Sequence, residues 1–246
     1  MNKLIVTLAV SSFLLLSACN GNGNENSKEI HFSTSAEYPP FEYVVRGEIT
    51  GFDVDLGNLV AKKLGKKAVF ENMQFSSVLP ALTLGQVEAA ISTITITPER
   101  KKNIDFTEPY YFEAMALVYK QDKPIHGEGQ LAGKKVACQL GSTMEIWLKK
   151  HLLQEQIMVM NNNNQAIEAL KAGYVDAVLM DGAQGTIFSK KNPGLATSFI
   201  AKSEDGYAIA VKKGSPLLTE INQALLALHA SGDIKNLEKK WLGEFK

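Results

Sequence analysis

One nine-residue pattern occurs twice in this chain, 88 residues apart, and it limits the possible folds more than any other feature. Residues 81–89 read ALTLGQVEA and residues 169–177 read ALKAGYVDA, with Ala-Leu, Gly, Val and an acidic residue before Ala at matching positions. Each copy predicts the end of a helix, a glycine that closes it, an acidic turn and an apolar strand. Chance similarity of two such units is the alternative. If the repeat is genuine, the chain folds into two similar α/β lobes.

The rest of the chain follows the same alternation of strands and helices with short links, which indicates a mostly parallel α/β architecture. The charged, turn-rich residues 120–129 are the best candidate for a crossing between the lobes, and a strand at 207–211 is the candidate return. We therefore expect lobe 1 to comprise residues 28–117 and 208–246, and lobe 2 to comprise residues 118–207. Two lobes joined by two crossings predict a ligand cleft that a hinge can close.

The stretch from Ser92 to Arg100 combines a strand end with a helix start. It continues the apolar run of the first repeat and alternates hydroxyl and apolar side chains. Thr97 then suits the N-cap, Pro98 the first helical position and Glu99 the positive end of a helix. Small hydroxyls, a guanidinium and free backbone N–H groups suit a small anion such as a carboxylate. An ordinary junction between a strand and a turn is the alternative.

The offset of the repeat pairs Thr93, at the end of the first strand, with Asp181, at the end of the second. Open α/β sheets bind ligands outside the carboxyl ends of their strands. The two lobes would therefore each present polar groups to a shared cleft.

The N-terminus has the composition of an export signal. Lys3 is followed by a 13-residue, mostly apolar run that is too short to span a bilayer comfortably. The run ends in Leu-Ser-Ala-Cys at residues 16–19, which resembles a bacterial lipobox. We expect residues 1–19 to be a lipoprotein signal peptide with Cys19 lipidated, and residues 20–27, rich in Gly and Asn, to be a flexible tether. A plain secretory signal with an incidental Cys is the alternative, and Asn20 leaves the anchoring membrane open.

Charge and cysteine usage exclude several functions. Lys plus Arg and Asp plus Glu number 26 each, so no strong field favours nucleic acid. Cys138 would have no disulfide partner if Cys19 carries lipid, and it lies in a strand-like run as a buried apolar residue would. The four histidines show no metal-ligand spacing, so we expect neither a metal nor a cofactor.

Several motifs in order resemble the polar amino acid-binding proteins of bacterial ABC importers, often called solute-binding protein family 3. They are Tyr-Pro-Pro-Phe-Glu at 38–42, Gly-Phe-Asp-Val-Asp-Leu at 51–56, Leu-Pro-Ala-Leu at 79–82, Ile-Thr-Pro-Glu-Arg at 96–100, Asp-Phe-Thr-Glu-Pro-Tyr at 105–110, Gly-Ser-Thr at 141–143 and Lys-Lys-Trp-Leu at 239–242. The resemblance covers residues 28–246. It implies a two-lobed periplasmic-binding-protein fold.

The resemblance also implies roles for site residues. Arg100 would clamp the α-carboxylate of the ligand, helped by Ser142 and Thr143. Asp181 would hold the α-ammonium, with Thr93 and Thr95. Further candidates for the site are two aromatic residues that would sandwich the ligand side chain, and one more hydroxyl: Tyr38, Phe75 and Ser92. The alternatives are a core position for either aromatic residue, a helix cap for Asp181 and a surface charge for Arg100.

The side-chain preference is less fixed by the sequence. Residues 139–143 and 33–41 are most similar to arginine-binding members of the family. A guanidinium between two aromatic faces gains cation–π attraction and needs acceptors at its tip, for which Glu37, Glu42 and Gln139 are candidates. Some basic amino acid binders carry Asp where this chain has Ser35, so glutamine and histidine stay open as ligands.

The resemblance predicts a non-enzymatic binding protein that captures a basic amino acid, L-arginine first, by closure of its lobes. It would work in the periplasm or at the cell surface as a lipid-anchored monomer, and would deliver the ligand to an ABC permease in the inner membrane. A periplasmic enzyme similar to cyclohexadienyl dehydratases is one alternative, and a ligand-sensing module is another.

Overall fold

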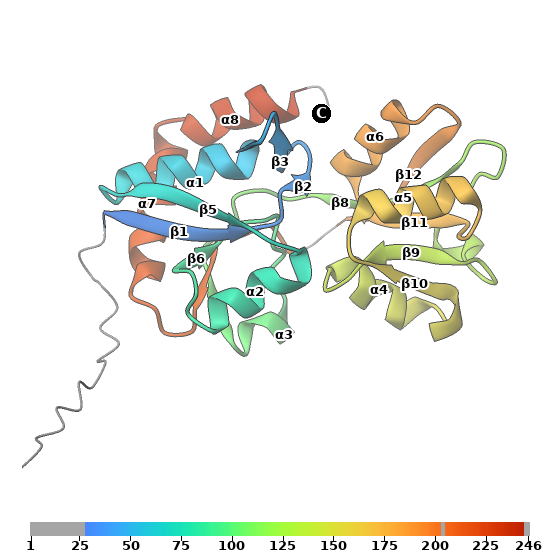
Figure 1. The fold of residues 1–246 in the computed structure, drawn as a ribbon, viewed down its shortest axis with the longest axis horizontal. Helices are drawn as coiled ribbons and strands as arrows, with labels where there is room; N and C mark the ends of the chain where they lie inside the picture. Colours follow the sequence, from blue (N-terminus) through green and yellow to red (C-terminus); the bar gives the residue numbers. More distant parts are fainter. Residues whose placement is uncertain (1–27, 203–204, 244–246) are drawn as a thin grey trace, which may run out of the picture.

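The computed structural model describes residues 28–202 and 205–243, and it has two lobes, each built on a five-stranded sheet (Figure 1). The first sheet has the order β5-β1-β6-β13-β7. Its strands are β1 (Glu29–Thr34), β5 (Lys67–Asn72), β6 (Ala89–Ala90), β7 (Ile104–Phe106) and β13 (Ala210–Lys212). The second sheet has the order β10-β9-β11-β8-β12. Its strands are β8 (Ala114–Lys120), β9 (Val136–Gln139), β10 (Ile157–Met160), β11 (Ala177–Asp181) and β12 (Leu195–Lys202).

The two sheets have the same topology. In each, three neighbouring strands are parallel, the fourth pairs antiparallel with the third, and the fifth pairs antiparallel with the fourth. The two repeat units occupy equivalent places, because β6 and β11 are the central strands and each follows a helix closed by a glycine at positive φ. These glycines are Gly85 at 72° and Gly173 at 82°. The two-lobed α/β fold expected from the sequence is confirmed.

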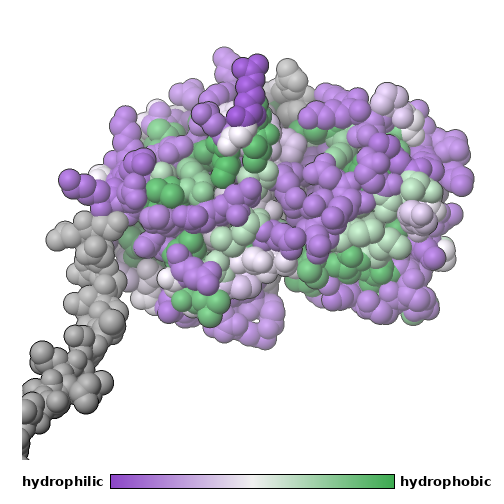
Figure 2. Space-filling model, in the orientation of Figure 1, coloured by the Kyte–Doolittle hydropathy of each residue, from purple (hydrophilic) through white to green (hydrophobic). Residues whose placement is uncertain are grey.

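Helices cover both faces of each sheet (Figure 1). The first lobe has α1 (Phe52–Lys63), α2 (Phe75–Thr83), α3 (Pro98–Lys101), α7 (Leu217–Ala230) and α8 (Asp233–Leu242). The second has α4 (Thr143–His151), α5 (Asn163–Ala172) and α6 (Gly182–Lys191), with short 3₁₀ turns η1 (Glu128–Gln130) and η2 (Gln154–Gln156). Each lobe therefore has two apolar clusters, one on each face of its sheet. Polar side chains cover most of the surface in view (Figure 2).

A small three-stranded sheet lies beside the first lobe and carries a residue of the site. Its strands are β2 (Glu37–Tyr38), β3 (Glu42–Val45) and β4 (Glu48–Thr50). Two prolines separate β2 from β3 and prevent either strand from continuing. The Tyr-Pro-Pro-Phe-Glu motif at residues 38–42 therefore contains the turn of a hairpin, in which Tyr38 is buried.

The strand pairing bears on where the chain crosses between the lobes. β8 lies in the second sheet over its whole length, so the expected boundary between residues 117 and 118 falls inside a strand. We propose instead that the first crossing precedes Ala114. Residues 120–129 lead from β8 to η1 within the second lobe and do not cross. β12, which the sequence did not predict, pairs with β8 and precedes the return to the first sheet.

The strand predicted to run from residue 89 to residue 97 is also shorter than expected. β6 ends at Ala90, and Thr93 has a φ of 47°. A β-branched residue rarely adopts a positive φ, and one that does cannot continue a strand. The chain therefore leaves the sheet before Thr93 and Thr95.

The expected signal peptide, the lipidated Cys19 and the tether lie outside the described residues. Within residues 28–202 and 205–243, no helix is long and apolar enough to cross a membrane.

Candidate functional site

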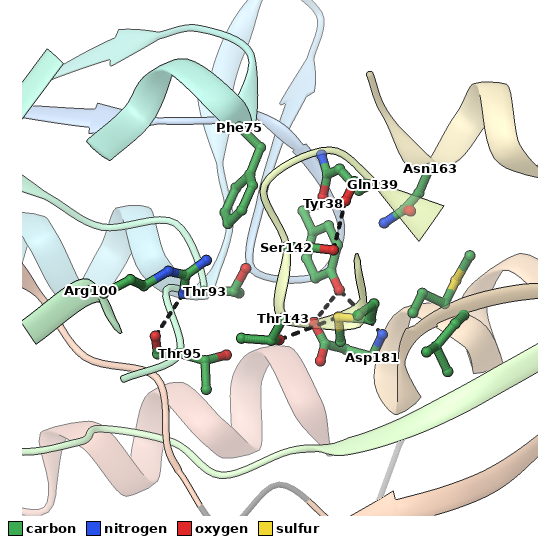
Figure 3. Close-up of a pocket in the computed structure, with 13 residues that line it drawn as sticks. Tyr38, Phe75, Thr93, Thr95, Arg100, Gln139, Ser142, Thr143, Asn163 and Asp181 are labelled. Carbon is green, nitrogen blue, oxygen red and sulfur yellow. Dashed lines mark hydrogen bonds between the residues drawn. The ribbon is translucent and has the colours of Figure 1, made fainter. Parts of the chain in front are cut away.

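Thirteen residues from both lobes line a cavity at the carboxyl ends of the central strands (Figure 3). Nine of them were expected from the sequence: Tyr38, Phe75, Thr93, Thr95, Arg100, Gln139, Ser142, Thr143 and Asp181. The space left between these side chains is small, about 20 Å³, which is room for about one water molecule. An amino acid could enter only if the lobes moved apart.

Arg100 is supplied by the short helix α3 that the sequence predicted. Thr97 caps the helix by accepting a hydrogen bond from the Arg100 backbone N–H at 3.1 Å, and Pro98 occupies the first position. The guanidinium turns back toward the cleft. Its Nη1 donates to the Thr95 carbonyl at 2.6 Å and its Nη2 donates to the Gly141 carbonyl of the other lobe at 2.9 Å. Burial lowers the pKa of Arg100 to about 10, so the group stays cationic at neutral pH.

Asp181 lies at the end of β11 in the second lobe, and Arg100 lines the same cavity from the first lobe (Figure 3). The hydroxyl of Tyr38, from the first lobe, donates to its carboxylate. Burial is the largest effect on Asp181 and raises its pKa to about 7, although the hydrogen bond from Tyr38 opposes the rise. Asp181 occupies the N-cap position of α6, as the helix-cap alternative expected, but its side chain makes no capping hydrogen bond.

The two aromatic residues both line the cavity, with different surroundings. The Arg100 guanidinium carbon lies 5.9 Å from the centre of the Phe75 ring, at the first turn of α2. Tyr38 is 6% exposed and is held by its bond to Asp181. Phe75 therefore covers the cationic group of the site, and Tyr38 covers the anionic group.

The start of α4 forms part of the wall. Ser142 is its N-cap, and its hydroxyl accepts from the Glu145 backbone N–H at 3.2 Å and donates to the Gln139 carbonyl at 2.7 Å. The hydroxyl is thus already engaged within the lobe. Thr143 follows as the first helical residue, beside the positive end of the helix dipole.

Four expected site residues do not line the cavity: Ser35, Glu37, Glu42 and Ser92. Glu37 lies directly behind Gln139, whose Nε2 donates to its Oε1 at 3.1 Å across the two lobes. Burial raises the pKa of Glu37. Ser92 and Glu42 bond to each other at 2.8 Å, and the backbone N–H of Ser35 donates to Ser92 at 3.0 Å. These three residues lie in a buried layer behind the wall.

Sequence reasoning missed four residues of the wall, all in the second lobe: Met144, Asn163, Leu179 and Met180. Asn163 begins α5 and is 4% exposed. Its Nδ2 donates to Gln184 at 2.6 Å, while its Oδ1 has no partner among the described residues. The signal for Asn163 was its place in the polar segment after β10, at the edge where the site forms. Leu179 and Met180 could not be recognised in the sequence, because apolar residues in a strand are expected in the hydrophobic core.

The arrangement places one half-buried cation, Arg100, and one buried carboxyl, Asp181, on opposite lobes of a closed cleft. A zwitterion with an α-carboxylate and an α-ammonium has the complementary charges. Among the described residues, no three His, Cys, Asp or Glu side chains are grouped so that they could hold a metal ion.

This fold and this site define a two-lobed binding protein for small solutes. The model of the bacterial extracellular solute-binding proteins, family 3, matches residues 30–244, and the chain belongs to this family. It is 35% identical to the arginine-binding extracellular protein ArtP of Bacillus subtilis (strain 168), over 97% of this chain and 96% of the relative.

Two similar solved structures are of an ancestral arginine-binding protein. The form bound to glutamine is 38% identical with a TM-score of 0.84, covering 88% of this chain and 98% of its own. The form bound to arginine is 37% identical with a TM-score of 0.82, covering 87% and 98%. The sequence-based identification of the family is confirmed.

Proposed function

We propose that this protein is the extracytoplasmic substrate-binding component of an amino acid ABC transporter, and that it binds a basic amino acid, L-arginine first. The observation that carries the proposal is the placement of Arg100 and Asp181 on opposite lobes around one closed cavity. Each lobe alone holds one charge, so a zwitterion gains both contacts only in the closed form. Ligand binding would therefore favour closure.

In this proposal the ligand replaces contacts that the site residues make with the protein itself. The α-carboxylate would take the two guanidinium N–H groups of Arg100 from the carbonyls of Thr95 and Gly141. The α-ammonium would displace the Tyr38 hydroxyl from Asp181. Thr93 and Thr143 would add hydroxyl contacts to these groups.

Glu37 favours a basic ligand side chain. It is a half-buried carboxyl behind Gln139, and among the described residues no cation pairs with it. A guanidinium reaching past Gln139 would supply that charge and return the pKa of Glu37 toward its ordinary value. The ancestral relative bound to glutamine supports glutamine as the alternative ligand, because Gln139 can pair with a neutral amide without Glu37.

A thermal-shift panel of the twenty amino acids tests the proposal. A ligand at 100 times its dissociation constant stabilises the folded state by about 2.7 kcal/mol. We expect the largest shift with L-arginine, and none with it in the Asp181→Asn variant. If no amino acid shifts the transition of the wild type, the binding proposal fails. A shift with glutamine alone overturns only the preference for a basic side chain.

The proposal extends to location and partners. Lipidation at Cys19 would hold the protein, as a monomer, at a membrane in the periplasm or at the cell surface, near an ABC permease of the inner membrane. Cys19→Ser should release the protein from the membrane fraction and remove the incorporation of labelled palmitate. Retention of both would contradict the anchor. The protein binds its ligand without converting it, so it is not an enzyme. The bound ligand should therefore be recovered chemically unchanged after denaturation. Mass spectrometry can check this.

A further inference from the structure

A buried layer of polar groups lies behind the wall of the cavity, and the ligand does not need to touch it. It contains two carboxyl side chains, Glu42 of β3 and Asp53 of α1, which are 1% and 0% exposed. Asp53 accepts from the Thr93 backbone N–H at 2.8 Å and from the Tyr110 hydroxyl at 2.8 and 2.9 Å. Glu42 accepts from Ser92 at 2.8 Å. Each carboxyl thus holds one of the two consecutive residues at which the chain leaves β6.

Thr93 needs such support. It lines the cavity with a φ of 47°, which disfavours a β-branched residue and persists only where neighbouring groups enforce it. Its backbone N–H points away from the sheet and into the carboxylate of Asp53. Without that acceptor the N–H would be buried and unpaired, and a relaxed backbone would move the Thr93 side chain.

The two carboxyls influence each other, because the nearby charge of Asp53 adds to the effect of burial on the pKa of Glu42. Oε1 of Glu42 accepts from Ser92, and Oε2 has no hydrogen-bond partner among the described residues, so Oε2 is the atom available to carry a proton. Burial is the largest effect on both groups. It raises the pKa of Glu42 well above the ordinary range and that of Asp53 to about 6. At neutral pH Glu42 is therefore protonated and Asp53 ionised.

We propose that the Glu42–Asp53 pair is a positioning element of the ligand site, in which ionised Asp53 fixes Thr93 and neutral Glu42 fixes Ser92 before the ligand arrives. Preorganisation of this kind strengthens binding because the wall need not be ordered when the ligand binds. The identity of the ligand in this inference rests on the proposed function. It adds two residues that act on the ligand only by holding the backbone at Ser92 and Thr93, of which Thr93 lines the cavity.

Isosteric variants distinguish this arrangement from simple packing. Asp53→Asn replaces an acceptor oxygen by an NH₂ group, which cannot accept from Thr93 or Tyr110. Glu42→Gln keeps what neutral Glu42 provides, an acceptor for Ser92 and an uncharged group near Asp53. We expect Asp53→Asn and Glu42→Ala each to weaken L-arginine binding by about tenfold, and Glu42→Gln to recover most of the loss of Glu42→Ala. Calorimetry at pH 7 measures the three dissociation constants.

Hydrogen exchange at the Thr93 amide provides a second measurement that needs no ligand. Exchange should be at least about tenfold faster in Asp53→Asn and close to that of the wild type in Glu42→Gln. Equal losses of affinity in Asp53→Asn and Glu42→Gln, or unchanged Thr93 exchange in Asp53→Asn, overturn the proposal. Glu42→Ala serves if Asp53→Asn does not fold, because it removes the acceptor of Ser92, and wild-type L-arginine affinity in this variant then refutes the role of the pair. A wild type that binds no amino acid refutes the proposed function alone, because the exchange measurement still tests the pair.

Discussion

Lowering the pH from 8 to 6 should weaken binding of the amino acid chiefly through one group, Asp181. This carboxyl is buried at the end of β11, and burial raises its pKa to about 7. The proposed α-ammonium contact requires the ionised form. A protonated Asp181 offers no charge to the ligand, so the ligand must first displace the proton.

The expected magnitude follows from this pKa. With the ligand bound, the neighbouring ammonium lowers the pKa of Asp181 well below 7, so each pH unit below 7 costs about a factor of ten in affinity. The dissociation constant should therefore rise roughly 10-fold by pH 6, or about 1.4 kcal/mol in binding free energy. Binding should release about one proton per ligand at pH 6 and almost none at pH 8.

Titration calorimetry in buffers of different ionisation enthalpy measures both the affinity and the number of protons released. Asp181→Asn is the matched control, since its amide does not titrate. We expect it to bind weakly, with an affinity that changes much less than that of the wild type between pH 8 and pH 6. A wild-type affinity that is constant over this range, without proton release at pH 6, would refute the assignment of Asp181 to the ammonium.

Three further predictions concern the site and the fold. Arg100→Ala should weaken binding at least about 100-fold, because the contact with the ligand carboxylate is lost. The unfolding temperature should change little, because the cap of α3 uses only the Arg100 backbone. Calorimetry tests the affinity and a melting curve tests the stability. Gly51→Ala should destabilise the fold by about 3 kcal/mol or more, because at a φ of 134° its Cβ would lie 2.1 Å from the Phe41 carbonyl oxygen. Gly47→Ala is the control: its φ is 87° but its Cβ would meet open space, so it should lower the free energy of unfolding by only about 1 kcal/mol. Urea titrations measure both variants. The raised pKa of Asp181 means that protonation favours the folded state. The ligand-free protein should therefore gain about 1.4 kcal/mol between pH 8 and pH 6 from this residue, and a wild type and an Asp181→Asn variant with parallel stability profiles would contradict this.

Much of the fold could be predicted because local signals and the repeat agreed. Thr97 and Pro98 start α3, and Gly173 ends α5, as their chemistry dictates. The crossings could not be predicted in the same way. Residues 120–129 have the composition of a linker, yet they join two elements of one lobe, because composition reports exposure and not the partner of the next strand.

The residues of the candidate site could likewise be predicted only in part. Arg100 and Asp181 could be predicted from strand ends and from the offset of the repeat. Glu42 and Ser92 have residue types suited to ligand contact, but the structure turns both away from the cavity. Asp53 belongs to the motif at residues 51–56, but it was not among the residues expected at the site. It is fully buried because β3 and the Thr93 segment pack over that turn, which no periodicity along α1 reveals.

The sequence by itself determined two similar α/β lobes, the helix starts around the cleft, and the two charged residues that face each other across it. These follow from propensity, capping and repetition, which act over a few neighbouring residues. Only the tertiary structure decided which polar residues touch the cavity and which support it from behind. That choice depends on the positive φ of Thr93 and on the packing of β3 against α1, where residues separated by about 40 to 50 positions share one buried set of hydrogen bonds.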